Sequence, residues 1–151
     1  MKIRNDFVSN SSSSSFIVDK SRHGCWFNQL FNIIQHIGKD NISTVGVVFD
    51  GGVDIAKLFA CFENSLPVDE WSPRGFSISK YRGKINWEDA KDQLIVEVRF
   101  VDLLGVKFIQ TNPDFMNHVV KVYVDLGWDN PADKRVYDML TATGLKFEWR
   151  R

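Results

Sequence analysis

Residues 26–49 read WFNQLFNIIQHIGKDNISTVGVVF, and this stretch decides the fold because a helical pattern passes directly into a strand pattern. Its first apolar residues recur at steps of three and four, as on the buried face of a helix: they are Trp26, Phe27, Leu30, Phe31, Ile34 and Ile37. Gly38 then occupies the position at which a glycine commonly ends a helix. The β-branched run at 42–49 predicts a buried strand, so the chain is expected to combine helices with a sheet.

Downstream, the same two periodicities mark further short elements. Asp50-Gly51-Gly52 predicts a turn between the first strand and a second helix. The helices expected from spacing and capping residues are at 55–62, from Asn86 through Leu94, at Pro113 for a single turn, and from Pro131 to Gly144 after the capping residue Asn130. The strands expected from alternation or dense apolar residues are at 16–19, 76–81, 95–101, 119–126 and 145–149. Residues 103–110 are expected to pair back on the strand before them.

The C-terminal part allows two finer predictions. The last helix is expected to end at Gly144 and to form its inward face with Val136, Tyr137 and Leu140. Residues 145–150 alternate between apolar and charged types, which predicts a strand with one wet face near a sheet edge.

Together these patterns predict an α+β fold. We expect a mixed or mainly antiparallel sheet with about three to four helices, packed mostly on one face. The 151 residues are enough for one domain that buries about two-thirds of the surface of its unfolded chain. We assign residues 1–15 to a serine-rich leader and residues 16–151 to a single globular domain.

Composition and charge exclude several classes of protein. The chain has 19 basic and 19 acidic residues, so it has no overall field that would attract nucleic acid or a membrane. No stretch approaches the roughly 20 apolar residues that cross a bilayer, and we therefore expect a cytoplasmic protein. Cys25 and Cys61 are the only two cysteines, too few for a disulfide framework, and we expect both to be reduced and partly buried.

The leader contains five consecutive serines, which are Ser11, Ser12, Ser13, Ser14 and Ser15. Serine hydroxyls bond nearby backbone groups and compete with helix and sheet hydrogen bonds, so irregular backbone is predicted over 10–15. In one interpretation Phe7-Val8 and Phe16-Ile17-Val18 enter the core, and the serines form a wet loop between them. In another, residues 1–15 are a disordered arm. A third interpretation, in which the serines hold an anion, lacks the glycine or lysine of known phosphate loops.

The first 18 residues, MKIRNDFVSNSSSSSFIV, resemble an N-terminal peptide found on many otherwise dissimilar small proteins of tailed phages and some bacteria. The resemblance implies a phage or mobile-element origin and a shared handling signal, such as recognition by a partner or a protease. It implies no catalytic residue.

Candidate metal and catalytic residues form no recognisable motif. His23 and Cys25 could be half of a metal site that His36, Cys61 or His118 completes, or could supply a nucleophile and a base, but their spacings match no zinc pattern and no local catalytic signature. Asp50-Gly51-Gly52 lacks the further glycine and lysine of a phosphate loop. The acids that could hold Mg²⁺ are Asp50, Asp54, Glu63, Glu97 and Asp125. We therefore expect no metal or cofactor and lean against an enzyme.

Residues 71–87 have the strongest claim to a binding role because aromatic and basic side chains alternate there. Such residues can stack on bases and contact phosphates, and they also dominate protein interfaces. The predicted contact residues are Trp71, Arg74, Phe76, Lys80, Tyr81, Arg82 and Trp87. The alternative is an ordinary loop with core aromatics and surface cations.

Three functions remain open. The leading hypothesis is a small phage-type accessory protein that binds a protein partner without catalysis. The first alternative is a minor virion or assembly component with the leader as an arm. The second is an enzyme with an unrecognised site, or a protein that binds nucleic acid through the local basic and aromatic patch.

Overall fold

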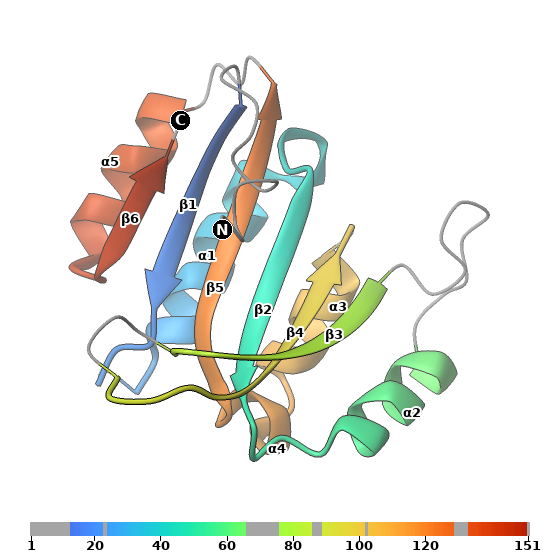
Figure 1. Cartoon of the computed structure of the whole chain (residues 1–151). Coiled ribbons are helices and arrows are strands. Elements are labelled where there is room, and N and C mark those ends of the chain that lie inside the picture. The colour runs from blue at the N-terminus through green and yellow to red at the C-terminus, as the bar shows by residue number, and fades with distance from the viewer. Residues whose placement is uncertain are drawn as a thin grey trace.

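The structure is a computed structural model that describes residues 13–22, 24–65, 76–85, 89–101, 103–128 and 133–150. In this part of the chain six strands form one antiparallel sheet in the order β3-β4-β2-β5-β1-β6 (Figure 1). The strands are β1 (Ser13–Asp19), β2 (Thr44–Asp50), β3 (Phe76–Gly83), β4 (Gln93–Phe100), β5 (Val119–Trp128) and β6 (Phe147–Arg150). The helices are α1 (Trp26–Ile37), the 3-10 helix η2 (Lys39–Asn41), α2 (Ile55–Ser65), α3 (Leu103–Gln110), α4 (Pro113–Met116) and α5 (Asp133–Thr143).

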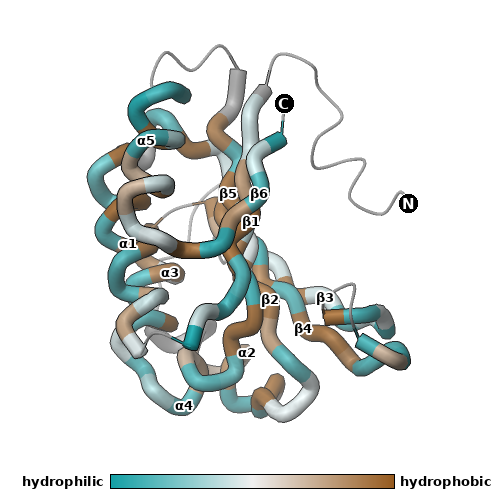
Figure 2. Tube along the Cα trace, turned by 90° about the vertical axis from the view of Figure 1, so that its left-hand side faces the viewer, coloured by the Kyte–Doolittle hydropathy of each residue, from teal (hydrophilic) through white to brown (hydrophobic). Residues whose placement is uncertain are grey.

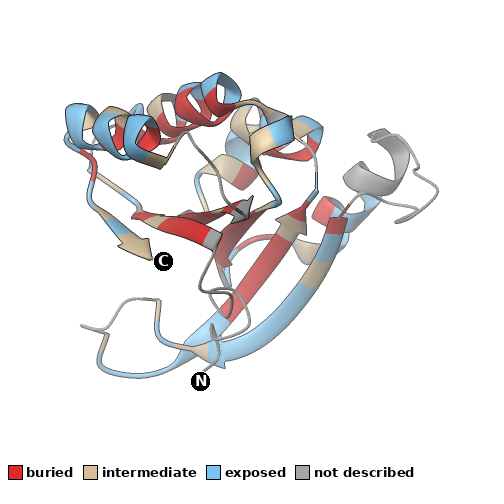
Figure 3. Ribbon diagram, turned by 90° about the horizontal axis from the view of Figure 1, so that it is seen from above, coloured by how far each residue is buried: buried red, intermediate tan, exposed pale blue. Residues whose placement is uncertain are grey.

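Helices α1, α3 and α5 cover one face of the sheet, and the opposite face is more open (Figures 2 and 3). Helix α1 shows why: every apolar residue of its predicted face is buried against the sheet. Its end is also as predicted, because Gly38 adopts φ 85° and its N–H donates to the carbonyl of Ile34. The α+β class, the antiparallel sheet and the one-sided helical cover are confirmed.

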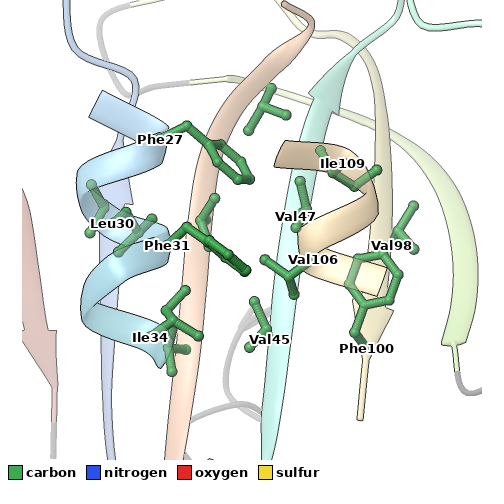
Figure 4. Packing of buried hydrophobic residues seen from close by; sticks show 14 of the residues in the cluster. Phe27, Leu30, Phe31, Ile34, Val45, Val47, Val98, Phe100, Val106 and Ile109 are labelled. Carbon is green, nitrogen blue, oxygen red and sulfur yellow. The ribbon is translucent and has the colours of Figure 1, made fainter. Parts of the chain in front are cut away.

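The main core lies between the helices and the sheet. Figure 4 shows Phe27 and Phe31 of α1 meeting Val45 and Val47 of β2. Helix α3 approaches closely because Gly105 faces the ring of Phe100, where an added Cβ would lie 2.2 Å from a ring carbon.

A second, smaller cluster lies on the open face. It consists of Val48, Ile95 and Tyr123. The connection that leaves β3 crosses in front of this face (Figure 1), and Ile85 in that connection packs against the cluster. The open face is therefore partly covered, and its central strands are buried on both sides.

Two element predictions are wrong. Residues 103–110 form helix α3 instead of a strand, because Gly105, Val106 and Ile109 have helical spacing and face the core. The predicted helix from Asn86 through Leu94 is also absent: residues 89–92 are not helical, and Leu94 lies in β4 opposite Arg82. Pairing with β3 outweighs the local capping signal there. Residues 86–88 lie outside the described residues, as do Asn130 and Pro131.

The serine run is the third correction. Ser13, Ser14 and Ser15 belong to β1, which pairs with β5 on one side and β6 on the other. The wet loop predicted over 10–15 is therefore wrong for these three residues, because strand pairing with β5, and at Ser15 with β6 as well, outweighs local bonding by the hydroxyls. Phe16 and Val18 enter the core as expected. Ser11, Ser12 and Phe7-Val8 lie outside the described residues.

Three smaller points complete the comparison. The described part has five α-helices, one of them a single turn, against the three to four expected. Tyr137 is 46% exposed instead of facing inward. Strand β6 lies at a sheet edge, as predicted.

In the residues that the structure describes, no helix has the length and apolar character needed to pass through a bilayer.

Candidate functional site

The predicted binding segment is only partly described. Trp71, Arg74 and Trp87 lie outside the described residues, whereas Phe76, Lys80, Tyr81 and Arg82 all lie on β3.

The structure divides these four residues among three environments. Phe76 is 7% exposed, and its ring packs edge to face on Phe59 of α2 at 6.1 Å. Lys80 pairs with the core residue Val96, so it points to the helical side of the sheet, and Arg82 does the same. Tyr81 points to the open face. Phe76 is therefore a core residue. Its burial does not support the prediction that it contacts a partner.

Strand β3 is an edge of the sheet. Its one strand neighbour in the described part is β4, so its other side faces away from the sheet. Most of its residues from Ser77 to Arg82 are exposed. An edge of this length is a template for an added strand.

On the open face of the sheet, a buried carboxylate on β4 connects β3 with β5. Glu97 of β4 is 3% exposed and accepts hydrogen bonds from Tyr123 Oη of β5 and from Tyr81 Oη of β3, the latter at 3.2 Å. A buried charge is tolerated only when it is hydrogen-bonded. These contacts tie the edge strand to the centre of the sheet.

Tyr123 reaches Glu97 by crossing over β2. The residue beneath its ring is Gly46, which is paired with both Tyr123 and Arg99. An added Cβ at Gly46 would lie 2.0 Å from the Tyr123 ring, so only glycine leaves room for the crossing. The guanidinium carbon of Arg99 lies 6.0 Å from the ring centroid, within reach of a cation–π contact.

The glycine turn after β2 holds a second polar cluster. Asp50 Oδ1 accepts a hydrogen bond from the Gly52 N–H at 2.8 Å and lies 2.9 Å from His118 Nδ1. A phosphate at this turn would meet the Asp50 carboxylate, so the turn interpretation holds and a phosphate loop has no support. Sequence reasoning named Asp50 and His118 but did not pair them, because 68 residues separate them.

The other chemical candidates are dispersed. In the described residues no group of three potential ligands could hold a metal ion; His23 and the side chain of Glu63 lie outside them. Asp54 accepts from the Lys57 N–H at 3.0 Å and thus caps α2. Neither cysteine is in a disulfide. Cys61 is half-buried, but Cys25 is exposed, which corrects the expectation that it is partly buried.

A hollow of about 420 Å³ lies at the opposite edge of the sheet from β3. It is lined by Asp133, Lys134, Tyr137, Asp138 and Trp149, which come from α5 and β6 (Figure 1). Sequence reasoning assigned Tyr137 and Trp149 to the structural faces of their elements and missed the hollow. The available signal was the spacing of Asp133, Tyr137 and Asp138, which places them on neighbouring turns of one helix.

Comparison with known proteins does not add a family: no protein-family model matches the chain, and no curated protein matches it.

Proposed function

We propose that this chain acts by binding a protein partner, which adds an extended segment to the outer edge of β3. The observation that carries the proposal is that an eight-residue edge strand is exposed over most of its length. Strand addition obtains its affinity from main-chain hydrogen bonds and its specificity from alternate side chains.

The charge of the edge indicates the chemistry of the partner. Lys80 and Arg82 are exposed on the same side of β3, and Arg82 Nη2 donates to the Asp92 carbonyl at 3.2 Å. Two cations on an edge oppose pairing with a second copy of the same strand. They favour an extended segment with carboxylates at alternate positions.

The resemblance of residues 1–18 to phage-type leaders supports a related proposal, that the partner is a phage or host protein and the chain is an accessory protein. No residue of the described part supports catalysis as strongly as β3 supports binding.

The proposal is tested with charge reversals at the edge. Lys80→Glu and Arg82→Glu should each reduce capture of the partner from host lysate, whereas the matched control Lys107→Glu, on the exposed side of α3, should not. Circular dichroism and thermal melting establish that each variant is folded.

Hydrogen exchange then distinguishes strand addition from other contacts. In the complex, the amides of residues 76–83 that point away from β4 should exchange more slowly than in the free protein, because the added strand pairs with them. A complex that leaves these amides unprotected, or that survives both reversals, would contradict the β3 assignment.

A further inference from the structure

We propose that the hollow between α5 and β6 binds an organic cation, such as a quaternary ammonium or a guanidinium group. This site is separate from β3, since β3 and β6 are the two opposite edges of the sheet. Its volume of about 420 Å³ is within the range of small-ligand pockets.

Two aromatic rings form one side of the hollow. Trp149 and Tyr137 stand nearly perpendicular, with their planes 77° apart and their centroids at 5.6 Å. The ring of Trp149 also stacks on that of Phe16, with the centroids 5.9 Å apart and the planes at 8°. Phe147 packs edge to face on Tyr137 at 5.4 Å. The rings are therefore held in place before a ligand arrives, which lowers the entropic cost of binding.

The polar side of the hollow carries more negative than positive charge. Asp133 and Asp138 both line it, against the single cation Lys134. Ser14 Oγ donates to Asp133 Oδ2 at 2.6 Å, which fixes the position of that carboxylate. Carboxylates beside aromatic faces are the combination that recognises organic cations.

Lys134 already pairs with one of the two carboxylates of the hollow. Its Nζ lies 3.1 Å from Asp138 Oδ2, but the two side chains are 87% and 60% exposed. Exposed pairs of this kind contribute little stability. A ligand cation that also contacts the rings can therefore displace Lys134 from Asp138, and Lys134 acts as an internal competitor.

The test is an NMR titration of the full chain, observed at the indole N–H of Trp149, which is assigned by its loss in Trp149→Phe. Choline should produce saturable shifts, and its neutral isostere 3,3-dimethylbutan-1-ol should not. An arginine-containing tripeptide, compared with its citrulline analogue, shows whether a basic side chain on a peptide is also accepted. Binding should weaken as salt is added.

Variants with opposite expected effects sharpen the test. Asp138→Asn and Tyr137→Leu should weaken choline binding about two- to fivefold. Lys134→Gln should strengthen it by a similar factor because the competitor is removed. Glu148→Gln, a carboxylate on the other face of β6, is the matched control and should have no effect.

Lys134→Gln should fold normally because Lys134 is exposed. The gain in choline affinity expected for this variant is therefore not confounded by misfolding. Equal binding of the neutral isostere would overturn the proposal. So would the absence of any Trp149 shift with both choline and the arginine peptide.

Discussion

Glu97 is the residue on which the open face of the sheet depends. Its carboxylate is buried between hydroxyls from two other strands, Tyr81 on β3 and Tyr123 on β5. Tyr123 is only 2% exposed, so water cannot replace its hydroxyl, which contributes more than an exposed hydrogen bond would.

At this scale, we expect Tyr123→Phe to lower the free energy of unfolding by about 1.5–3 kcal/mol, the usual contribution of a hydrogen bond to a charged group. Tyr81→Phe should cost less, because Tyr81 is 39% exposed and water can reach its position. Urea denaturation measures both variants. Equal losses of stability in the two variants would contradict the expectation that the bond from Tyr123 to Glu97 contributes more than the bond from Tyr81.

Gly46 supports the same network from below. Gly46→Ala places a Cβ against the Tyr123 ring and should destabilise the fold by about 1–3 kcal/mol through overpacking. Gly24→Ala is the control, because nothing lies within 4 Å of a Cβ there. In a Tyr123→Leu background the cost of Gly46→Ala should shrink. An unchanged cost in that background would mean that the strain lies elsewhere.

At the scale of the element, β1 shows that two adjacent serines can have opposite effects on the stability of the fold. Ser14 points to the helices and donates to Asp133. Ser15 points to the open face and is 2% exposed, and among the described residues its Oγ has no hydrogen-bond partner. A buried polar group without a partner costs free energy.

We therefore expect Ser14→Ala to lower the free energy of unfolding by about 1.5–3 kcal/mol. Ser15→Ala should raise it or leave it unchanged. Thermal and urea unfolding of the two single variants measure the difference. A loss of stability in Ser15→Ala as large as in Ser14→Ala would contradict this account of the strand.

Helices α2 and α4 are joined by an exposed ion pair with a defined pH dependence. Asp114 accepts a hydrogen bond from Lys57 Nζ at 3.1 Å, and this bond together with the carboxylate charge raises the pKa of Lys57 above its usual 10.5. A raised pKa means that folding favours the protonated lysine. The stabilisation is therefore complete below pH 10.5 and is lost as the pH rises through the folded-state pKa.

The stability difference between wild type and Lys57→Gln should accordingly stay constant from neutral pH to about pH 10 and vanish at higher pH. It should also shrink as salt is added. Urea denaturation as a function of pH checks both statements. A difference that disappears already near neutral pH would exclude this ion pair as its source.

Elements whose apolar residues recur with a clear local period could be predicted from the sequence. Elements whose conformation depends on pairing with distant strands could not. Residues 26–37 and 42–49 show their periods directly, and both elements are present. For 103–110 the apolar run suited either structure. The serines of β1 carry no strand signal in the sequence. Their extended conformation comes from pairing with β5 and, at Ser15, also with β6.

The same limit applies to the candidate sites. Lys80, Tyr81 and Arg82 were predicted to bind from local composition, but their division between two faces depends on the register with β4. The hollow needs Trp149 from β6 beside Tyr137 from α5. The spacing of Asp133, Tyr137 and Asp138 on one helix does not show which strand lies beside them, so the local sequence does not predict the complete site.

At the scale of the whole molecule, the two sheet edges differ in length. Strand β3 has eight residues and an exposed surface, whereas β6 has four and carries the rings of the hollow. A chain ending after Lys146 would lose β6 and leave β1 as the edge. We expect this truncation to associate through β1, because a long unprotected edge pairs with other strands. Light scattering with size-exclusion chromatography measures it, and a stable monomer would contradict the expectation.

The pairing of β1 with both β5 and β6 also has a consequence for biosynthesis. During translation, Phe16 and Val18 leave the ribosome more than a hundred residues before the strands that flank them. At a synthesis rate of about 5–20 residues per second, this apolar segment remains without its neighbours for several seconds. The nascent chain is thus expected to need a chaperone over this interval, however stable the finished protein is.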